Sequence, residues 1–169
     1  MKTKALALCA VLVALALGLS YLERFLPLQV AVPLPGVKLG LANIVTLMAL
    51  YFLGTRPAVT ILGLRCFLGS LFGGGLSALA FSLTGGLLAF GVMALLLRCS
   101  FLSLFGVSIA GAAAHNTGQI LAAMAVLGSR APLVYLPPLL LCSLVTGAVT
   151  GGASMLLVHR IPLPGDIKS

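Results

Sequence analysis

The densest group of side chains able to hydrogen-bond or titrate is His115-Asn116-Thr117-Gly118-Gln119, which lies inside a long apolar run. His115 and Gln119 are four residues apart and share one face of a helix, whereas Asn116 points about 100° away, toward a neighbouring helix. Unpaired polar groups are costly in an apolar environment. Bonds between helices would account for one or two of these groups, so a cluster this dense favours a polar cavity.

Arg65 is the second residue of this kind, because it lies seven positions into the apolar run that begins at Ala58, about 10 Å along a helix. The apolar runs contain no carboxylate that could pair with it. Its acceptor is therefore expected to be the backbone of a broken helix or an anionic ligand. A structural arginine that caps glycine-rich turns near residues 73–75 is the alternative.

A further apolar run adds Asn43 and Thr46, one helical turn apart, and Lys38 stands just before it. With Lys38 and Arg65 and no acid among these residues, the ligand is expected to be anionic or neutral polar rather than cationic. The expected substrate-binding residues are Lys38, Asn43, Arg65, His115, Asn116 and Gln119.

The chain is poor in groups for catalysis. Its two acids, Glu23 and Asp166, lie outside the apolar runs, so they form neither a paired acid–base site nor a Mg²⁺ site. No Lys follows a Gly, which excludes a Gly-Lys phosphate loop. The cysteines are far apart and suggest no disulfide or zinc site. We expect no catalytic residue, no metal and no cofactor.

The composition indicates an integral membrane protein. Of 169 residues, 61% are apolar and 7% are charged, against about 25% charged in soluble domains. The mean hydropathy is +1.24, which also excludes a disordered chain. The net charge of +8 comes from single, scattered basic residues. This pattern fits loop charges and lipid headgroups, so no nucleic-acid partner is expected.

Six apolar runs of the kind that crosses a bilayer are bounded by charges, Pro or Gly. The pattern predicts an all-α, polytopic six-helix bundle forming one domain over residues 1–169. The spans are expected at about 5–22, 39–53, 58–72, 76–97, 105–127 and 133–158. The second and third runs are short, so a five-span chain in which these two form a re-entrant pair is the alternative.

The distribution of basic residues predicts the orientation. An even number of spans puts both ends on one side, and with the N-terminus inside, six basic residues are cytoplasmic and three are external. We therefore expect both termini in the cytoplasm. Cleavage of a signal peptide near Ala16-Leu17-Gly18 is the alternative, but the apolar run is long for a signal core.

Small residues at helical spacing mark close approaches between helices. The first run carries Ala10, Ala14 and Gly18, and the last carries Gly147 and Gly151. Most such stripes serve packing inside the bundle. The stripe on the first run, which is free of polar residues, is a candidate for docking a second membrane protein.

Three motifs, in this order, resemble one family. They are the stretch from Pro35 to Val45 (PGVKLGLANIV), Arg65 ahead of Gly69 and the glycines at 73–75, and His115-Asn116-x-Gly118-Gln119. Over nearly its whole length the chain resembles the Gx transporter family, which is also labelled heptaprenyl diphosphate synthase component I. That family is similar to the substrate-binding S components of energy-coupling factor (ECF) transporters.

The resemblance implies a six-helix subunit of the bacterial plasma membrane that captures a small solute from outside. A separate module, with one membrane coupling subunit and two ATPases, would drive uptake by toppling the binding subunit. By this resemblance, Ala10-x-x-x-Ala14 is the docking motif for the coupling subunit, together with Gly18. The segment 23–38 would be the gate over the binding site.

The family's other label implies a subunit of isoprenoid synthesis. Prenyl transferases bind Mg²⁺-diphosphate through clusters of Asp, and this chain has one Asp, in its tail. The alternative to transport is therefore a non-catalytic membrane subunit or scaffold for isoprenoid or redox enzymes. A channel would need a repeated pore-lining pattern or a charged ring, which the sequence lacks.

Overall fold

The computed structural model describes residues 3–25, 38–72, 75–99 and 101–160. These ranges contain helices and no strand, which confirms the all-α prediction. The elements are α1 (Thr3–Leu22), the 3₁₀ helix η1 (Glu23–Phe25), α3 (Asn43–Leu53), α4 (Thr55–Leu71), α5 (Gly75–Leu96), α6 (Leu104–Leu127), the 3₁₀ helix η2 (Ala131–Tyr135) and α7 (Leu136–Arg160).

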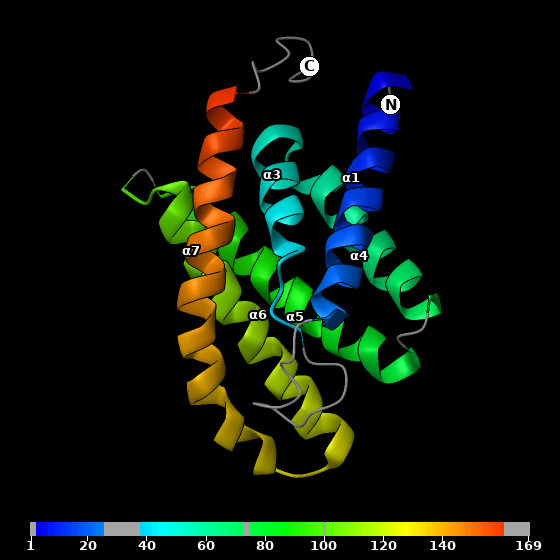
Figure 1. The fold of residues 1–169 in the computed structure, drawn as a ribbon, viewed down its shortest axis with the longest axis vertical. Coiled ribbons are helices and arrows are strands. Elements are labelled where there is room, and N and C mark those ends of the chain that lie inside the picture. The colour runs from blue at the N-terminus through cyan, green and yellow to red at the C-terminus, as the bar shows by residue number, and fades with distance from the viewer. Residues whose placement is uncertain (1–2, 26–37, 73–74, 100, 161–169) are drawn as a thin grey trace.

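The short helix α3 lies at the centre of the bundle and contacts each of the other five long helices (Figure 1). Six consecutive residues, 45–50, are buried and all of them except Thr46 are apolar, as expected of a helix enclosed by others. The helix α6 packs between α5 and α7. The first turn of α1 and the last turn of α7 lie at the same end of the bundle (Figure 1).

Two of the predicted spans begin elsewhere than expected. Residues 39–42 were predicted to be helical, but α3 begins only at Asn43, because Gly40 has a φ of +83° and the chain turns there. In contrast, α4 begins at Thr55, three residues before the predicted start. Pro57 is tolerated because the first turn of a helix needs no backbone N–H donors. The helices α1, α5, α6 and α7 begin and end within three residues of the four remaining apolar runs.

The glycine stripe of α7 is a packing seam, as expected of most such stripes. A Cβ atom on Gly147 would lie 2.5 Å from Ile109 Cα, and one on Gly151 would lie 3.0 Å from Phe105 Cα, so both glycines let the backbone of α6 approach. Gly118 plays the same part between α6 and α5, where its Cβ would lie 2.7 Å from Gly85 Cα. These close approaches hold α6 in the middle of the bundle.

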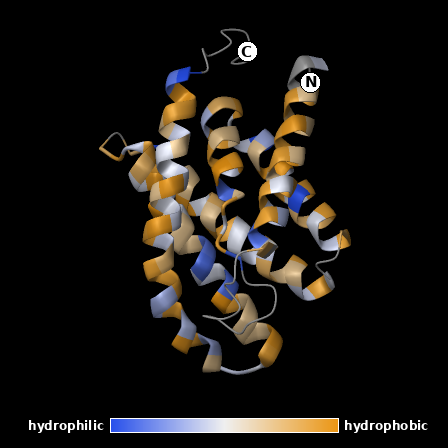
Figure 2. Cartoon of the chain, in the orientation of Figure 1, coloured by the Kyte–Doolittle hydropathy of each residue, from blue (hydrophilic) through white to orange (hydrophobic). Residues whose placement is uncertain are grey.

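Two helical segments, Gly75–Leu96 and Ala131–Arg160, are long and apolar enough to cross a membrane. Many large apolar side chains are exposed, among them Leu141, Val145 and Val149 on α7. Figure 2 shows that hydrophobic stretches dominate the helices, while several hydrophilic stretches lie toward the middle of the bundle. The polar residues of the bundle are therefore largely enclosed by apolar ones.

Candidate binding site

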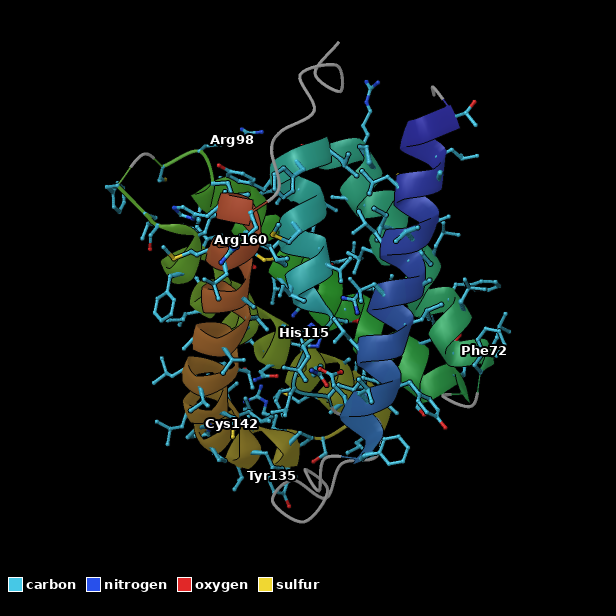
Figure 3. All side chains as sticks on the ribbon, turned by 45° about the horizontal axis from the view of Figure 1, so that its top comes forward. Phe72, Arg98, His115, Tyr135, Cys142 and Arg160 are labelled. Atoms are coloured by element: carbon cyan, nitrogen blue, oxygen red, sulfur yellow. The ribbon has the colours of Figure 1, made fainter. Side chains whose placement is uncertain are left out.

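Three helices place a polar cluster in the middle of the bundle. Asn43 begins α3, Arg65 lies within α4 and His115 lies within α6, and all three side chains are buried. Figure 3 shows His115 in the centre of the molecule. Arg65 Nη2 donates a hydrogen bond of 3.0 Å to Asn43 Oδ1, so Arg65 is bound to α3 and does not cap a glycine turn through this group.

Within the described ranges, five buried side-chain atoms of this polar cluster make no hydrogen bond of regular geometry. They are Asn43 Nδ2, Thr46 Oγ1, Arg65 Nε and both ring nitrogens of His115. More than nine in ten buried polar groups in native proteins are paired, and an unpaired one costs about 1–3 kcal/mol. Five such atoms on three adjoining helices therefore indicate a place for a polar ligand.

Gln119 connects α6 to the segment before α3. Its Nε2 donates to the Lys38 carbonyl oxygen and its Oε1 accepts from the Lys38 N–H, both at 2.7 Å. This two-way pair joins residues that are 81 positions apart. The structure thus brings Lys38 and Gln119 together, and it holds the segment at 38–41 beside His115.

Asn116 faces α7, as its position on the helix predicted. Its Nδ2 donates to the Leu139 carbonyl oxygen at 2.9 Å, and its Oδ1 accepts from Gln119 Nε2 at 3.5 Å. The amide therefore ties α6 to α7. Direct binding of a solute by Asn116 stays a prediction.

Replacing Asn116 with leucine is expected to destabilise the protein by about 0.5–1.5 kcal/mol, because one hydrogen bond between helices is lost in an apolar setting. The midpoint of unfolding in mixed detergent, followed by circular dichroism, measures this loss. Thr117→Val is the matched control, since within the described residues the Thr117 hydroxyl bonds to Ala113 of its own helix. Equal stability of the two variants would contradict the role of Asn116.

Glu23 belongs to the same polar cluster and was missed by the sequence analysis. Its side chain is 4% exposed, accepts a hydrogen bond from the Leu41 N–H and interacts electrostatically with Arg65 and Lys38. The expectation that Arg65 has no acid near it is therefore wrong. The one sequence signal was that Glu23 is a single acid at the end of an apolar run. Its contact with Leu41 joins residues 18 positions apart, and no local sequence pattern predicts such a contact.

Burial raises the pKa of the Glu23 carboxyl above its ordinary value of 4.5, although the Leu41 N–H, Arg65 and Lys38 act in the opposite direction. The folded protein therefore binds this proton more readily than the unfolded chain. The contribution of Glu23 to stability is therefore fully present at pH values below the pKa that Glu23 has in the unfolded chain. It is lost as the pH rises through the pKa that Glu23 has in the folded protein.

We expect Glu23→Gln to remove this loss. Melting temperatures measured between pH 4.5 and pH 8 should fall more steeply for the wild type than for the variant. Groups that titrate in both proteins cancel in the comparison. Parallel curves would show that Glu23 does not titrate differently in the folded state.

Glycines give the polar cluster its close contacts. A Cβ on Gly40 would lie 2.8 Å from both Asn43 Nδ2 and His115 Cδ2, and one on Gly85 would lie 3.0 Å from His115 Nδ1. A Cβ on Gly86 would lie 3.5 Å from Arg65 Nη2. The sequence alone did not single out Gly85 or Gly86, because their importance depends on which side chains of α4 and α6 pack against them.

The candidate docking stripe of α1 lies on the surface. Ala10, Ala14 and Gly18 are all exposed, and nothing lies within 4 Å of a Cβ placed on Gly18. The stripe is thus not used for packing within the bundle. Most of the predicted gate falls at residues 26–37, which lie outside the described residues.

Chemically, the polar cluster is suited to binding. It contains one carboxylate, one guanidinium, one imidazole and several amides, and it offers no pair of carboxylates for acid–base work. Within the described ranges, no group of three His, Cys, Asp or Glu residues is placed to hold a metal ion.

Comparison with family models identifies the family of the chain. A family model described as heptaprenyl diphosphate synthase component I matches residues 12–157. The matched region includes every residue of the polar cluster from Glu23 to Gln119. No curated protein and no solved structure matches the chain.

Proposed function

Because the chain belongs to the heptaprenyl diphosphate synthase component I family and buries a polar cluster, we propose that it is a solute-binding subunit for membrane transport. The five unpartnered atoms of the cluster are the observation that carries this proposal. A small anionic or neutral polar solute entering from the outer side would satisfy them. The proposed subunit has no catalytic role.

We place the protein in the bacterial plasma membrane, with six spans similar to those of ECF S components and both termini in the cytoplasm. The exposed apolar side chains on α7 and on α1 would face lipid. Arg98 and Arg160 lie at one end of the bundle and Tyr135 at the other (Figure 3). Basic residues at the end where α1 begins and α7 ends support a cytoplasmic position of that end.

Energy for uptake would come from a separate ECF module with a membrane coupling subunit and two ATPases. The exposed stripe of Ala10, Ala14 and Gly18 supports this step, since small residues let another helix approach closely. The stripe is exposed within the described bundle and would therefore be available to a partner.

Replacing Ala14 with leucine should weaken this association at least about tenfold, because a bulky side chain prevents close helix contact. The measurement is the yield of coupling subunit and ATPases captured from membranes with the tagged protein. Val11→Leu, which enlarges another exposed residue of α1, should leave the yield unchanged. Equal losses in both variants would argue against the stripe as the docking face.

A second candidate function is favoured by the family's description, which names a component of heptaprenyl diphosphate synthase. In that case the chain would be a non-catalytic membrane subunit or scaffold, and a synthase component would be its partner. This candidate leaves the five unpartnered atoms of the cluster without a role.

Affinity purification from native membranes in mild detergent separates the two candidates. The transport proposal expects a small polar solute, identified by mass spectrometry, together with a coupling protein and two ATPases. Recovery of a prenyl synthase component, with no bound solute and no ATPases, would overturn the transport proposal and support the second candidate.

A further inference from the structure

The unpartnered atoms of the polar cluster are mostly hydrogen-bond donors. Asn43 Nδ2 and Arg65 Nε can only donate, whereas the Thr46 hydroxyl and the neutral His115 ring can both donate and accept. The carboxamide oxygen of Asn43 is already used by Arg65. A ligand that satisfies the cluster must therefore bring more acceptors than donors.

The charges around the polar cluster also favour a ligand that is rich in acceptors and negatively charged. Arg65 is 6% exposed, and Lys38 is held beside α6 by Gln119. Glu23 is the one acid within the described ranges. Burial raises the pKa of the Glu23 carboxyl, and when Glu23 is protonated the buried Arg65 guanidinium gives the polar cluster a net positive charge. A buried net positive charge is costly without a counter-charge, and a negative ligand would supply it.

The donors also converge. Asn43 Nδ2 and His115 Cδ2 both lie 2.8 Å from the position that a Cβ on Gly40 would occupy, so the two side chains meet at Gly40. Arg65 is bound to the same Asn43 side chain. In addition, α3 begins at Asn43, so the positive end of its dipole points into the polar cluster.

We propose that the polar cluster binds the acid group, a carboxylate or a phosphate, of an anionic solute. Arg65 Nε–H, Asn43 Nδ2–H and one N–H of His115 are the donors to its oxygens. Planar guanidinium and amide groups suit such oxygens, and hydrogen bonds to charged groups are the stronger ones. This inference rests on the proposed binding function and narrows its solute to acids.

The test uses acetate, inorganic phosphate and acetamide as probes of the full-length protein in detergent, with ionic strength fixed by choline chloride. Acetamide matches acetate in size without its charge. Unfolding is followed with a thiol-reactive dye, because Cys66 is buried and becomes reactive when the chain unfolds. At about five times its Kd, a probe should raise the melting temperature by roughly 2–4 °C.

We expect a saturable shift with acetate or phosphate, none with acetamide, and an at least tenfold weaker response in Arg65→Gln. Arg56→Gln, which changes an exposed arginine of the same helix, should respond as the wild type does. The stronger of the two anions identifies the acid group. Equal shifts with acetate and acetamide, equal shifts in the two variants, or no shift with either anion would overturn the inference.

The result separates this inference from the proposed function. If native membranes yield the protein with a bound solute that lacks an acid group, solute binding stands and the acid assignment fails. If no solute is retained and no probe acts, both fail.

Discussion

Arg65→Met is expected to reduce the amount of solute that co-purifies with the protein by roughly 10- to 100-fold, since a hydrogen bond to a charged group contributes about 1.5–3 kcal/mol. Arg65 is the cation most deeply placed in the polar cluster, and its Nε–H has no partner within the described part of the chain. Methionine has a similar length and suits an apolar surrounding, so the substitution removes the charge and the donors with little change in volume.

The matched control is Arg56→Met on the same helix, where the side chain is exposed. Both variants lose one positive charge, so a general effect of net charge would appear in both. Solute retention per mole of protein is measured by mass spectrometry after gel filtration, which also confirms that each variant is folded. Retention at the wild-type level in a folded Arg65→Met protein would remove Arg65 from the binding site.

The helices and the core of the site could be predicted because their signals are local. Continuous apolar runs between charges gave six helices, and the spacing of His115 and Gln119 placed both side chains on one buried face. The density of polar residues around Gly118 predicted a polar cavity; most of these side chains are buried, and the cavity itself stays a prediction. Arg65 attracted attention because a charge inside an apolar run is costly wherever it lies.

The contacts that complete the site could not be predicted because they join distant parts of the chain. Glu23 reaches Leu41, and Gln119 reaches the backbone of Lys38 across 81 positions. Neither contact produces a periodic pattern of residue types that could be recognised in the sequence. The late start of α3 has a similar origin, since the positive φ of Gly40 reflects its contact with His115. A single sequence offers no means to find such pairs.

The helix seam that positions these residues leads to the largest expected effect on stability. Gly147→Ala should lower the free energy of unfolding by about 1–3 kcal/mol, because its Cβ would lie 2.5 Å from Ile109 Cα. The obstacle is backbone, which cannot rotate away as a side chain can. To admit the methyl group, α7 must move away from α6, which weakens the hydrogen bond from Asn116 to Leu139.

Gly152→Ala on the same helix is the matched control, because nothing lies within 4 Å of its Cβ. Alanine favours a helix over glycine by about 1 kcal/mol, so this control should be as stable as the wild type or more stable. The two substitutions are chemically identical, and the signs of their effects are expected to differ. Melting curves in one detergent measure both, and a Gly147→Ala protein as stable as Gly152→Ala would mean that α6 and α7 do not meet at Gly147. Since α6 carries His115, Asn116 and Gln119, that result would also displace the polar cluster from the place described above.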